Sequence, residues 1–145
     1  MINVKYLNYA LIVLGLLISV GTSIYAAQPW GDNYAYQDIS GYFSLLLWEL
    51  WIGLPFLVLY LLNKNYSNSS AHLKLLFVAC LLGSIFASYI YVDSIMFSSS
   101  STSALIFIFM PAYQLIFLAI IGTVCLVLSK SLNQSLPSDS AKPRL

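Results

Sequence analysis

Four long apolar runs constrain this chain more than any other feature of its sequence. They cover residues 6–27, 41–62, 73–97 and 104–128. Each run exceeds the roughly 20 residues that an α-helix needs to cross about 30 Å of hydrocarbon. A membrane β-strand needs only about 9 to 11 residues of alternating polarity, and these runs do not alternate. The sequence therefore predicts an all-α integral membrane protein with four transmembrane helices.

Short connections join the predicted helices. The links cover residues 28–40, 63–72 and 98–103, and links of this length make consecutive helices antiparallel. We therefore expect an up-down-up-down bundle that forms one transmembrane domain over residues 1–128. The polar segment 129–145 is expected to be a flexible cytoplasmic tail.

The composition agrees with a membrane protein. The chain is 60% hydrophobic and 8% charged, whereas roughly a quarter of the residues of a soluble protein are charged. A soluble domain with this much exposed apolar surface would aggregate. The net charge of +1 gives no sign of nucleic-acid binding. The expected partners are the lipid bilayer and either another membrane protein or further copies of this chain.

The positions of the basic residues predict the orientation. All of them flank the runs on one side: Lys5, Lys64, Lys74, Lys130, Lys142 and Arg144. The opposite side carries Asp32, Asp38 and Asp93 with no lysine or arginine. By the positive-inside rule, both termini are expected in the cytoplasm of a multi-pass protein of the plasma (inner) membrane.

A second interpretation of the first run stays open. Lys5, the apolar stretch and the small residues Ala26 and Ala27 also resemble a cleaved signal peptide, which would leave three helices. The run is longer than the roughly 7 to 15 residues of a signal core, which favours a retained helix. Mass spectrometry of the intact protein distinguishes the two, because a mature chain that starts near residue 27 would contradict the four-helix prediction.

Small residues indicate where the helices pack, because close contact in a bilayer relies on small and polar side chains. They recur at four-residue spacing in two runs: Gly15, Ser19 and Ser23 in the first, and Ala79, Gly83 and Ala87 in the third, with Cys80, Ser84 and Ser88 one position round. Pro55 and Pro111 lie inside the second and fourth runs. Each proline removes a helix hydrogen bond and is expected to kink its helix.

Glu49 is the strongest candidate for a functional residue. It lies about 12 Å along the second helix from its outer end, where an unpaired carboxylate costs several kcal/mol. No lysine or arginine lies within the membrane part of the runs. Glu49 is therefore expected to be neutral, or to face a hydrated cavity that binds a proton or cation. Gln114 or Tyr113 of the fourth run would lie at a similar depth and could form a hydrogen bond with Glu49. Such a bond could equally serve only to hold the two helices together.

The outer end supplies two further candidate sites. Asp93 is shallow enough to reach interfacial water, and Ser101, Thr102 and Ser103 either cap the fourth helix or line the mouth of a polar cavity. The first outer loop carries aromatic anchors for an external contact, which could equally form the aromatic belt of the membrane interface: Trp30, Tyr34 and Tyr36.

Catalysis has little support in the sequence. The single histidine, His72, is expected to be a solvated residue at a helix start, and Cys80 and Cys125 do not form a C-x-x-C pair. No hydrolase, metalloprotease or phosphate-binding motif is present. We therefore expect that the protein is not an enzyme and that it has no cofactor or metal site.

Two classes of function remain. The first is a small non-enzymatic inner-membrane protein that binds or shields another membrane component, and the chain is similar to immunity, exclusion and accessory proteins in size and layout. The alternative is a proton- or cation-linked small transporter or channel, with Glu49 as the titrating acid and Gln114, Tyr113 and Asp93 along the path. Small multidrug exporters also have four helices and a membrane glutamate, but the position of Glu49 and the fixed orientation argue against that family.

Overall fold

The computed structural model describes residues 4–31, 38–66, 70–96 and 103–134, and this part of the chain is almost entirely helical. Helix α1 covers Val4–Ala27, α2 covers Ile39–Tyr66 and α5 covers Ser103–Gln134. The third long helix consists of three consecutive pieces: α3 (Ser70–Cys80), the π-helix η2 (Leu81–Phe86) and α4 (Ala87–Met96). Within the described residues, four helices are long and apolar enough to cross a membrane, which confirms the prediction from the apolar runs.

Two helices extend past the C-terminal ends of their apolar runs. Helix α2 continues past residue 62 to Tyr66, and α5 continues past residue 128 to Gln134, so the predicted tail begins no earlier than residue 135. Hydropathy marks where contact with lipid would end, whereas a helix continues as long as its backbone hydrogen bonds and side-chain contacts persist. Ser129, for example, donates a hydrogen bond to the Cys125 carbonyl one turn earlier (2.9 Å).

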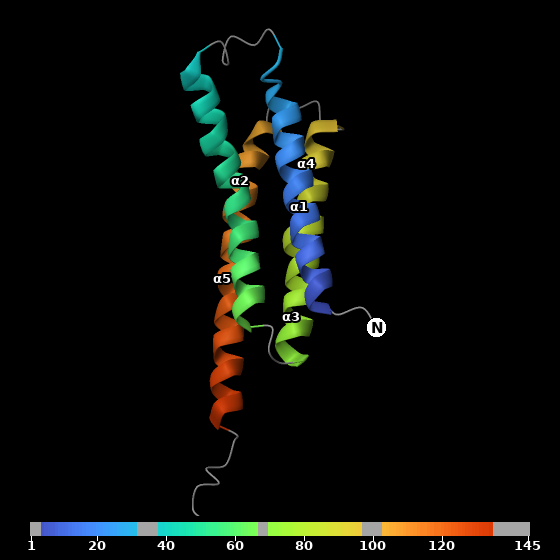
Figure 1. Cartoon of the computed structure of the whole chain (residues 1–145), viewed down its shortest axis with the longest axis vertical. Coiled ribbons are helices and arrows are strands. Elements are labelled where there is room, and N and C mark those ends of the chain that lie inside the picture. The colour runs from blue at the N-terminus through green and yellow to red at the C-terminus, as the bar shows by residue number, and fades with distance from the viewer. Residues whose placement is uncertain (1–3, 32–37, 67–69, 97–102, 135–145) are drawn as a thin grey trace, which may run out of the picture.

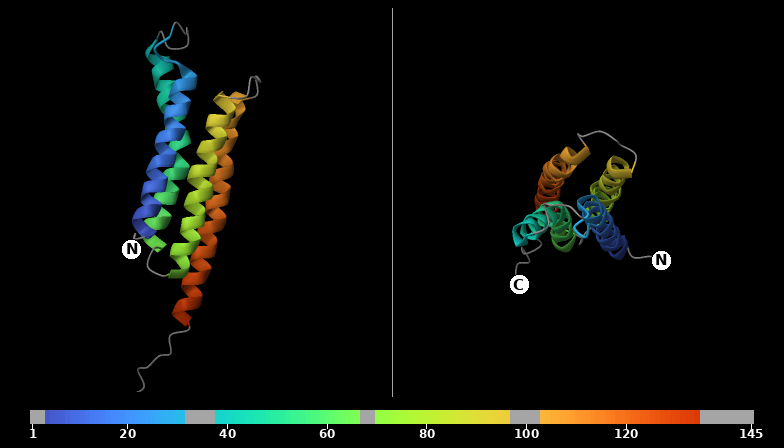
Figure 2. Two further views of the ribbon diagram at one scale, coloured as in Figure 1. Left: turned by 90° about the vertical axis from the view of Figure 1, so that its right-hand side faces the viewer. Right: turned by 90° about the horizontal axis from the view of Figure 1, so that it is seen from above.

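The four long helices lie side by side (Figures 1 and 2). Helix α1 packs against α2 and against the third long helix, and α5 packs against the same two neighbours from the other side. Helix α1 begins and α5 ends toward the lower end of Figure 1. We call this the lysine end, because it carries the described lysines: Lys5, Lys64, Lys74 and Lys130.

Small residues lie at the contact between α1 and the third long helix, where Gly15 and Ser19 meet Ser84 and Ser88, whereas Gly83 of the predicted stripe faces Leu59 of α2 and Leu118 of α5. Gly15, Ser19 and Ser23 are buried, and so are all six small residues of the predicted stripe on the third long helix. The closest approach lies at Gly15, where an added Cβ atom would lie 2.6 Å from the Cβ of Ser84. Only glycine fits there without a shift of the facing backbone. We call this contact the seam.

Apolar packing divides into two clusters. The larger lies toward the lysine end and includes Leu59, Leu76 and Cys80, whereas the smaller consists of Ile52, Tyr91 and Phe107. Pro55 and Pro111 lie inside α2 and α5 and are fully buried, while the kinks they imply stay a prediction.

The π-helix η2 is a feature that the sequence did not predict. The backbone is π-helical from Leu81 to Phe86, and the amide of the following Ala87 bonds to the Ser84 oxygen. Within this segment the Gly83 oxygen accepts a hydrogen bond from a side chain of α5, described below. Single π-turns inside α-helices occur frequently at functional sites.

Candidate functional site

The Glu49 carboxylate lies inside the bundle between three helices. Both of its oxygens are buried, and neither has a hydrogen-bond partner. Its polar neighbours are the hydroxyl groups of Ser23 on α1 and Tyr91 on α4. The Ser23 hydroxyl lies beside the carboxylate without reaching hydrogen-bond geometry. We call these three residues the Glu49 cluster.

Tyr91 is held in place by aromatic packing. Its ring is fully buried and stacks on Phe107 of α5, with 5.0 Å between the centroids and 22° between the planes. The hydroxyl has no hydrogen-bond partner. A buried phenol usually finds a partner, so the Tyr91 hydroxyl and the Glu49 carboxylate are two unpartnered polar groups in the same part of the bundle.

The local sequence of α2 explains why Glu49 points toward α1. Gly53 follows one turn later on the same helix face and contacts Leu16 of α1, with 3.7 Å between an added Cβ atom and the leucine methyl carbon. The larger residues Ile52 and Phe56 occupy the neighbouring face and are buried. Glu49 thus lies where α2 has a small residue and α1 presents Ser23.

An apolar groove of about 1060 Å³ runs between α1 and α2. Its lining extends along α2 from Tyr42 to Tyr60 and along α1 from Ile12 to Ile24, and Pro29 beyond the end of α1 also contributes. Among the described residues that line it, Glu49 is the one with a charged side chain. We call this the α1–α2 groove.

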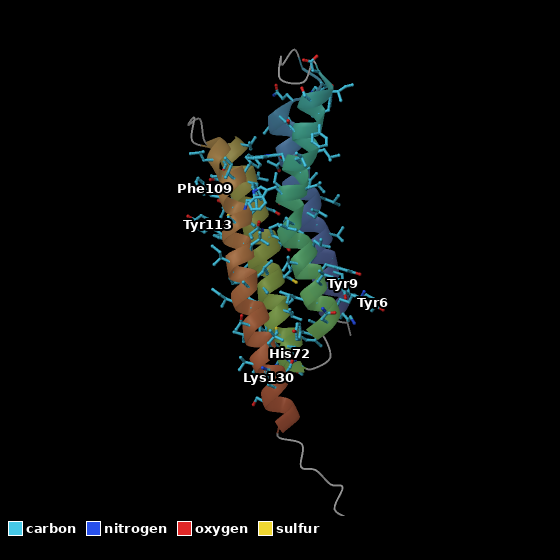
Figure 3. The ribbon with its side chains drawn as sticks, turned by 90° about the vertical axis from the view of Figure 1, so that its left-hand side faces the viewer. Tyr6, Tyr9, His72, Phe109, Tyr113 and Lys130 are labelled. Atoms are coloured by element: carbon cyan, nitrogen blue, oxygen red, sulfur yellow. The ribbon has the colours of Figure 1, made fainter. Side chains whose placement is uncertain are left out.

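Gln114 and Tyr113 do not pair with Glu49. Gln114 is buried, but its amide donates to the Gly83 carbonyl at 2.6 Å. Tyr113 is 65% exposed and points away from the other helices (Figure 3). The predicted pairing is therefore wrong, because the backbone of η2 presents Gly83 to α5 and a one-residue rotation takes Tyr113 to the outer face.

The predicted outer sites stay apart from the Glu49 cluster or outside the described residues. Asp93 is exposed on α4, and Trp30 is exposed after the end of α1. Helix α5 begins at Ser103. The remaining candidates lie outside the described residues: Tyr34, Tyr36, Ser101 and Thr102.

A second polar cluster lies toward the lysine end. The Asn8 amide donates to the Asn63 side-chain oxygen at 2.8 Å, and the Asn63 amide donates to Cys80 Sγ at 3.2 Å and to the Leu59 carbonyl at 3.3 Å. We call this the amide cluster. Sequence reasoning assigned Asn63 to a link and did not single out Asn8, although a lone asparagine inside an apolar run was a signal for it.

His72 is buried rather than solvated, contrary to the prediction. Its Nε2 atom lies 3.2 Å from the Cys125 carbonyl oxygen and 3.3 Å from the Ser129 hydroxyl, both on α5. Figure 3 places it at the level of Lys130, inside the lysine end. The polar backbone and hydroxyl of α5 offer His72 the partners that water would have supplied.

No group of three or more histidine, cysteine, aspartate or glutamate residues is placed to hold a metal ion within residues 4–31, 38–66, 70–96 and 103–134. Both cysteines are buried free thiols. Comparisons of the chain with protein-family models, with curated proteins and with solved structures found no match.

Proposed function

We propose that the chain lies in the inner membrane as an up-down-up-down bundle with both termini in the cytoplasm. Four apolar helices of sufficient length support insertion. The described lysines gather at one end of the bundle, which favours that end as the cytoplasmic one. In this orientation the α1–α2 groove opens toward lipid.

Within the membrane, we propose that the protein binds one transmembrane helix of another membrane protein in the α1–α2 groove. The observation that carries the proposal is the extent of the groove, which follows α2 from Tyr42 to Tyr60, a rise of about 27 Å. A lipid acyl chain covers one leaflet, about 15 Å, which is roughly half of that length. A transmembrane helix covers all of it.

The lining of the groove also favours a helix. Gly53 leaves the α2 backbone uncovered at the floor, and small residues allow two helix backbones to approach closely. Exposed apolar side chains on both sides are available for packing: Leu46 and Leu50 on α2, and Val13 on α1. The partner is therefore expected to be an apolar helix with small residues on its contact face.

Site-specific photo-crosslinking in native membranes tests this proposal. A photo-reactive amino acid replaces Leu50 in the groove, and a matched control replaces Ile116 on α5, because the two side chains are similarly exposed (62% and 60%). We expect the Leu50 position alone to yield a crosslink whose mapped site lies in a transmembrane helix of another protein. Gly53→Leu, which fills the floor of the α1–α2 groove, should abolish this crosslink. Crosslinks to lipid or to a second copy only, or a product that Gly53→Leu leaves unchanged, would contradict the proposal.

A second candidate function is proton- or cation-linked transport, with Glu49 as the titrating acid. The observation that favours it is the buried carboxylate with two unpartnered oxygens beside two hydroxyl groups. Acidic side chains inside a membrane commonly mark ion or proton pathways. Flux into proteoliposomes tests it: if the wild-type protein carries neither protons nor cations, or if Glu49→Gln leaves the flux unchanged, this candidate fails.

A further inference from the structure

The α1–α2 groove has one acidic side chain in its middle part. Among the described lining residues, the polar side chains are the phenols of Tyr42 and Tyr60 at the two ends and the carboxyl group of Glu49 between them. Glu49 lies about 10 Å along α2 from Tyr42 and about 17 Å from Tyr60. The rest of this lining is apolar. A helix that occupies the groove therefore meets one acid near the centre of a long apolar contact.

No described residue forms a hydrogen bond with this carboxylate. Both oxygens of Glu49 are buried without a partner. The described lysines lie at the lysine end, and none of them lines the groove. Lipid tails in the groove would supply no hydrogen-bond donor, and an unpaired carboxylate within hydrocarbon is unfavourable. A side chain of a second protein can supply the missing partner.

The Glu49 carboxylate can turn toward the groove without breaking a hydrogen bond. It lies beside the hydroxyl groups of Ser23 and Tyr91, while the same residue lines the groove. Rotation about the side-chain torsions moves the two oxygens toward the groove, and such rotamer changes are common when an interface forms. Because neither oxygen is hydrogen-bonded, no bond holds the carboxylate in its inward position.

We propose that the partner helix carries one lysine or arginine near its centre, which forms an ion pair with Glu49 in the α1–α2 groove. The proposal rests on the helix-binding function and specifies the chemistry of the partner. Ionisable side chains inside a membrane are commonly paired with one another. A basic side chain donates to the carboxylate oxygens and also neutralises their charge. A neutral donor such as a serine hydroxyl would leave that charge in place.

The ion pair also gives the groove a means of selecting one helix among many. Apolar contacts discriminate weakly between transmembrane helices, because lipid tails are as apolar as leucine. A buried charge that loses its partner is strongly unfavourable, so a helix without the basic residue gains less from binding beside Glu49. The basic residue is itself unfavourable in lipid, and both charged groups therefore gain from the contact.

Photo-crosslinking in native membranes tests the ion pair. The photo-reactive amino acid replaces Leu50 or, in a second variant, Leu57, which is 54% exposed in the groove about two turns beyond Glu49. Glu49→Gln should lower the yield of the partner crosslink at least about tenfold from both positions. Asp93→Asn is the matched control, because Asp93 is an exposed acid of α4 outside the groove lining. It should leave both yields unchanged.

The amino-acid sequence of the crosslinked helix, read by mass spectrometry, gives the second result. We expect a lysine or arginine near the middle of that helix. A helix without a basic residue, or a yield that Glu49→Gln leaves unchanged, would overturn the ion pair and leave helix binding standing.

Two further outcomes have a defined meaning. A loss of yield at Leu50 but not at Leu57 would show only a local effect on the neighbouring probe and would also overturn the ion pair. An absence of crosslinks to a helix of another protein from both positions would overturn the ion pair together with helix binding. Thermal unfolding of Glu49→Gln in detergent shows that a lower yield is not a loss of fold.

Discussion

The amide cluster and the Glu49 cluster are both buried inside the bundle, but they differ in how their polar atoms are paired. Asn63 uses its oxygen and both donors in bonds to Asn8, Cys80 and Leu59, and in this cluster the Asn8 oxygen alone has no partner. Glu49 has no hydrogen bond at either oxygen. A paired amide ties helices together, whereas an unpaired carboxylate lowers stability. The difference indicates that the amide cluster maintains the fold and that Glu49 is present for another reason.

The apolar packing around the two clusters also differs. The amide cluster adjoins the larger apolar cluster, which includes Leu59 and Cys80, two of the residues bonded to Asn63. Glu49 borders the α1–α2 groove, next to a cluster of only three buried apolar residues. The larger buried cluster therefore lies around the amide cluster, whereas Glu49 borders a groove with space for a ligand.

The largest effect is expected at the seam, which lies between the two clusters. Gly15→Leu would force a side chain into the contact with Ser84 and should lower the free energy of unfolding by about 3 kcal/mol. The matched control is Gly21→Leu on the same helix, since nothing lies within 4 Å of a Cβ atom added there. Thermal unfolding in a mild detergent measures both. Equal melting temperatures for the two variants would contradict the close crossing.

Asn63→Leu tests the structural half of the comparison. It removes an acceptor and leaves the Asn8 amide buried without its partner, so the free energy of unfolding should fall by about 2 kcal/mol. The double variant Asn8→Leu/Asn63→Leu should recover part of the loss, because no unpaired amide remains. If the double variant loses more unfolding free energy than the two single variants lose together, Asn8 and Asn63 do not stabilise the bundle as a hydrogen-bonded pair.

Gln114→Leu tests the role of Gln114, which the sequence predicted to be a hydrogen-bond partner of Glu49. Loss of its bond to the Gly83 carbonyl should lower the free energy of unfolding by about 1 kcal/mol and leave any function of Glu49 intact. Tyr113→Phe, at the exposed neighbour, should change nothing. A loss of function without a loss of stability in Gln114→Leu would restore Gln114 as part of the Glu49 site.

The smallest expected change in stability is at Glu49 itself. Glu49→Gln keeps the shape of the side chain and removes a buried group that has no counter-charge, so unfolding should shift by less than about 0.5 kcal/mol or toward higher stability. The same unfolding assay measures it beside Asn63→Leu. A loss as large as that of Asn63→Leu would make Glu49 a structural residue and remove the contrast between the clusters.

The sequence predicted those features of the fold that depend on local composition and residue spacing. Long apolar runs identified the four membrane-length helices, and the spacing of Gly15, Ser19 and Ser23 identified the buried face of α1. Both follow from helix geometry and from the small side chains that close packing requires.

Side-chain partners could not be predicted, because they depend on the rotation of each helix and on backbone irregularities. The π-helix η2 presents the Gly83 carbonyl to Gln114, and no residue pattern indicated it. Tyr91 is one of eleven tyrosines, and only its position opposite Phe107 brings its hydroxyl to Glu49. Glu49 itself was identified from its depth, while both of its neighbours required the fold.

If the transport candidate is right, Glu49 takes up and releases a proton inside the bundle, whereas the amide cluster holds the helices together. Infrared difference spectra of the protein in vesicles, recorded as the pH is changed, report the carboxyl group directly. We predict a titrating carboxyl band in the wild-type protein that Glu49→Gln removes and Asp93→Asn, at an exposed acid, retains. A spectrum that Glu49→Gln leaves unchanged would contradict the account.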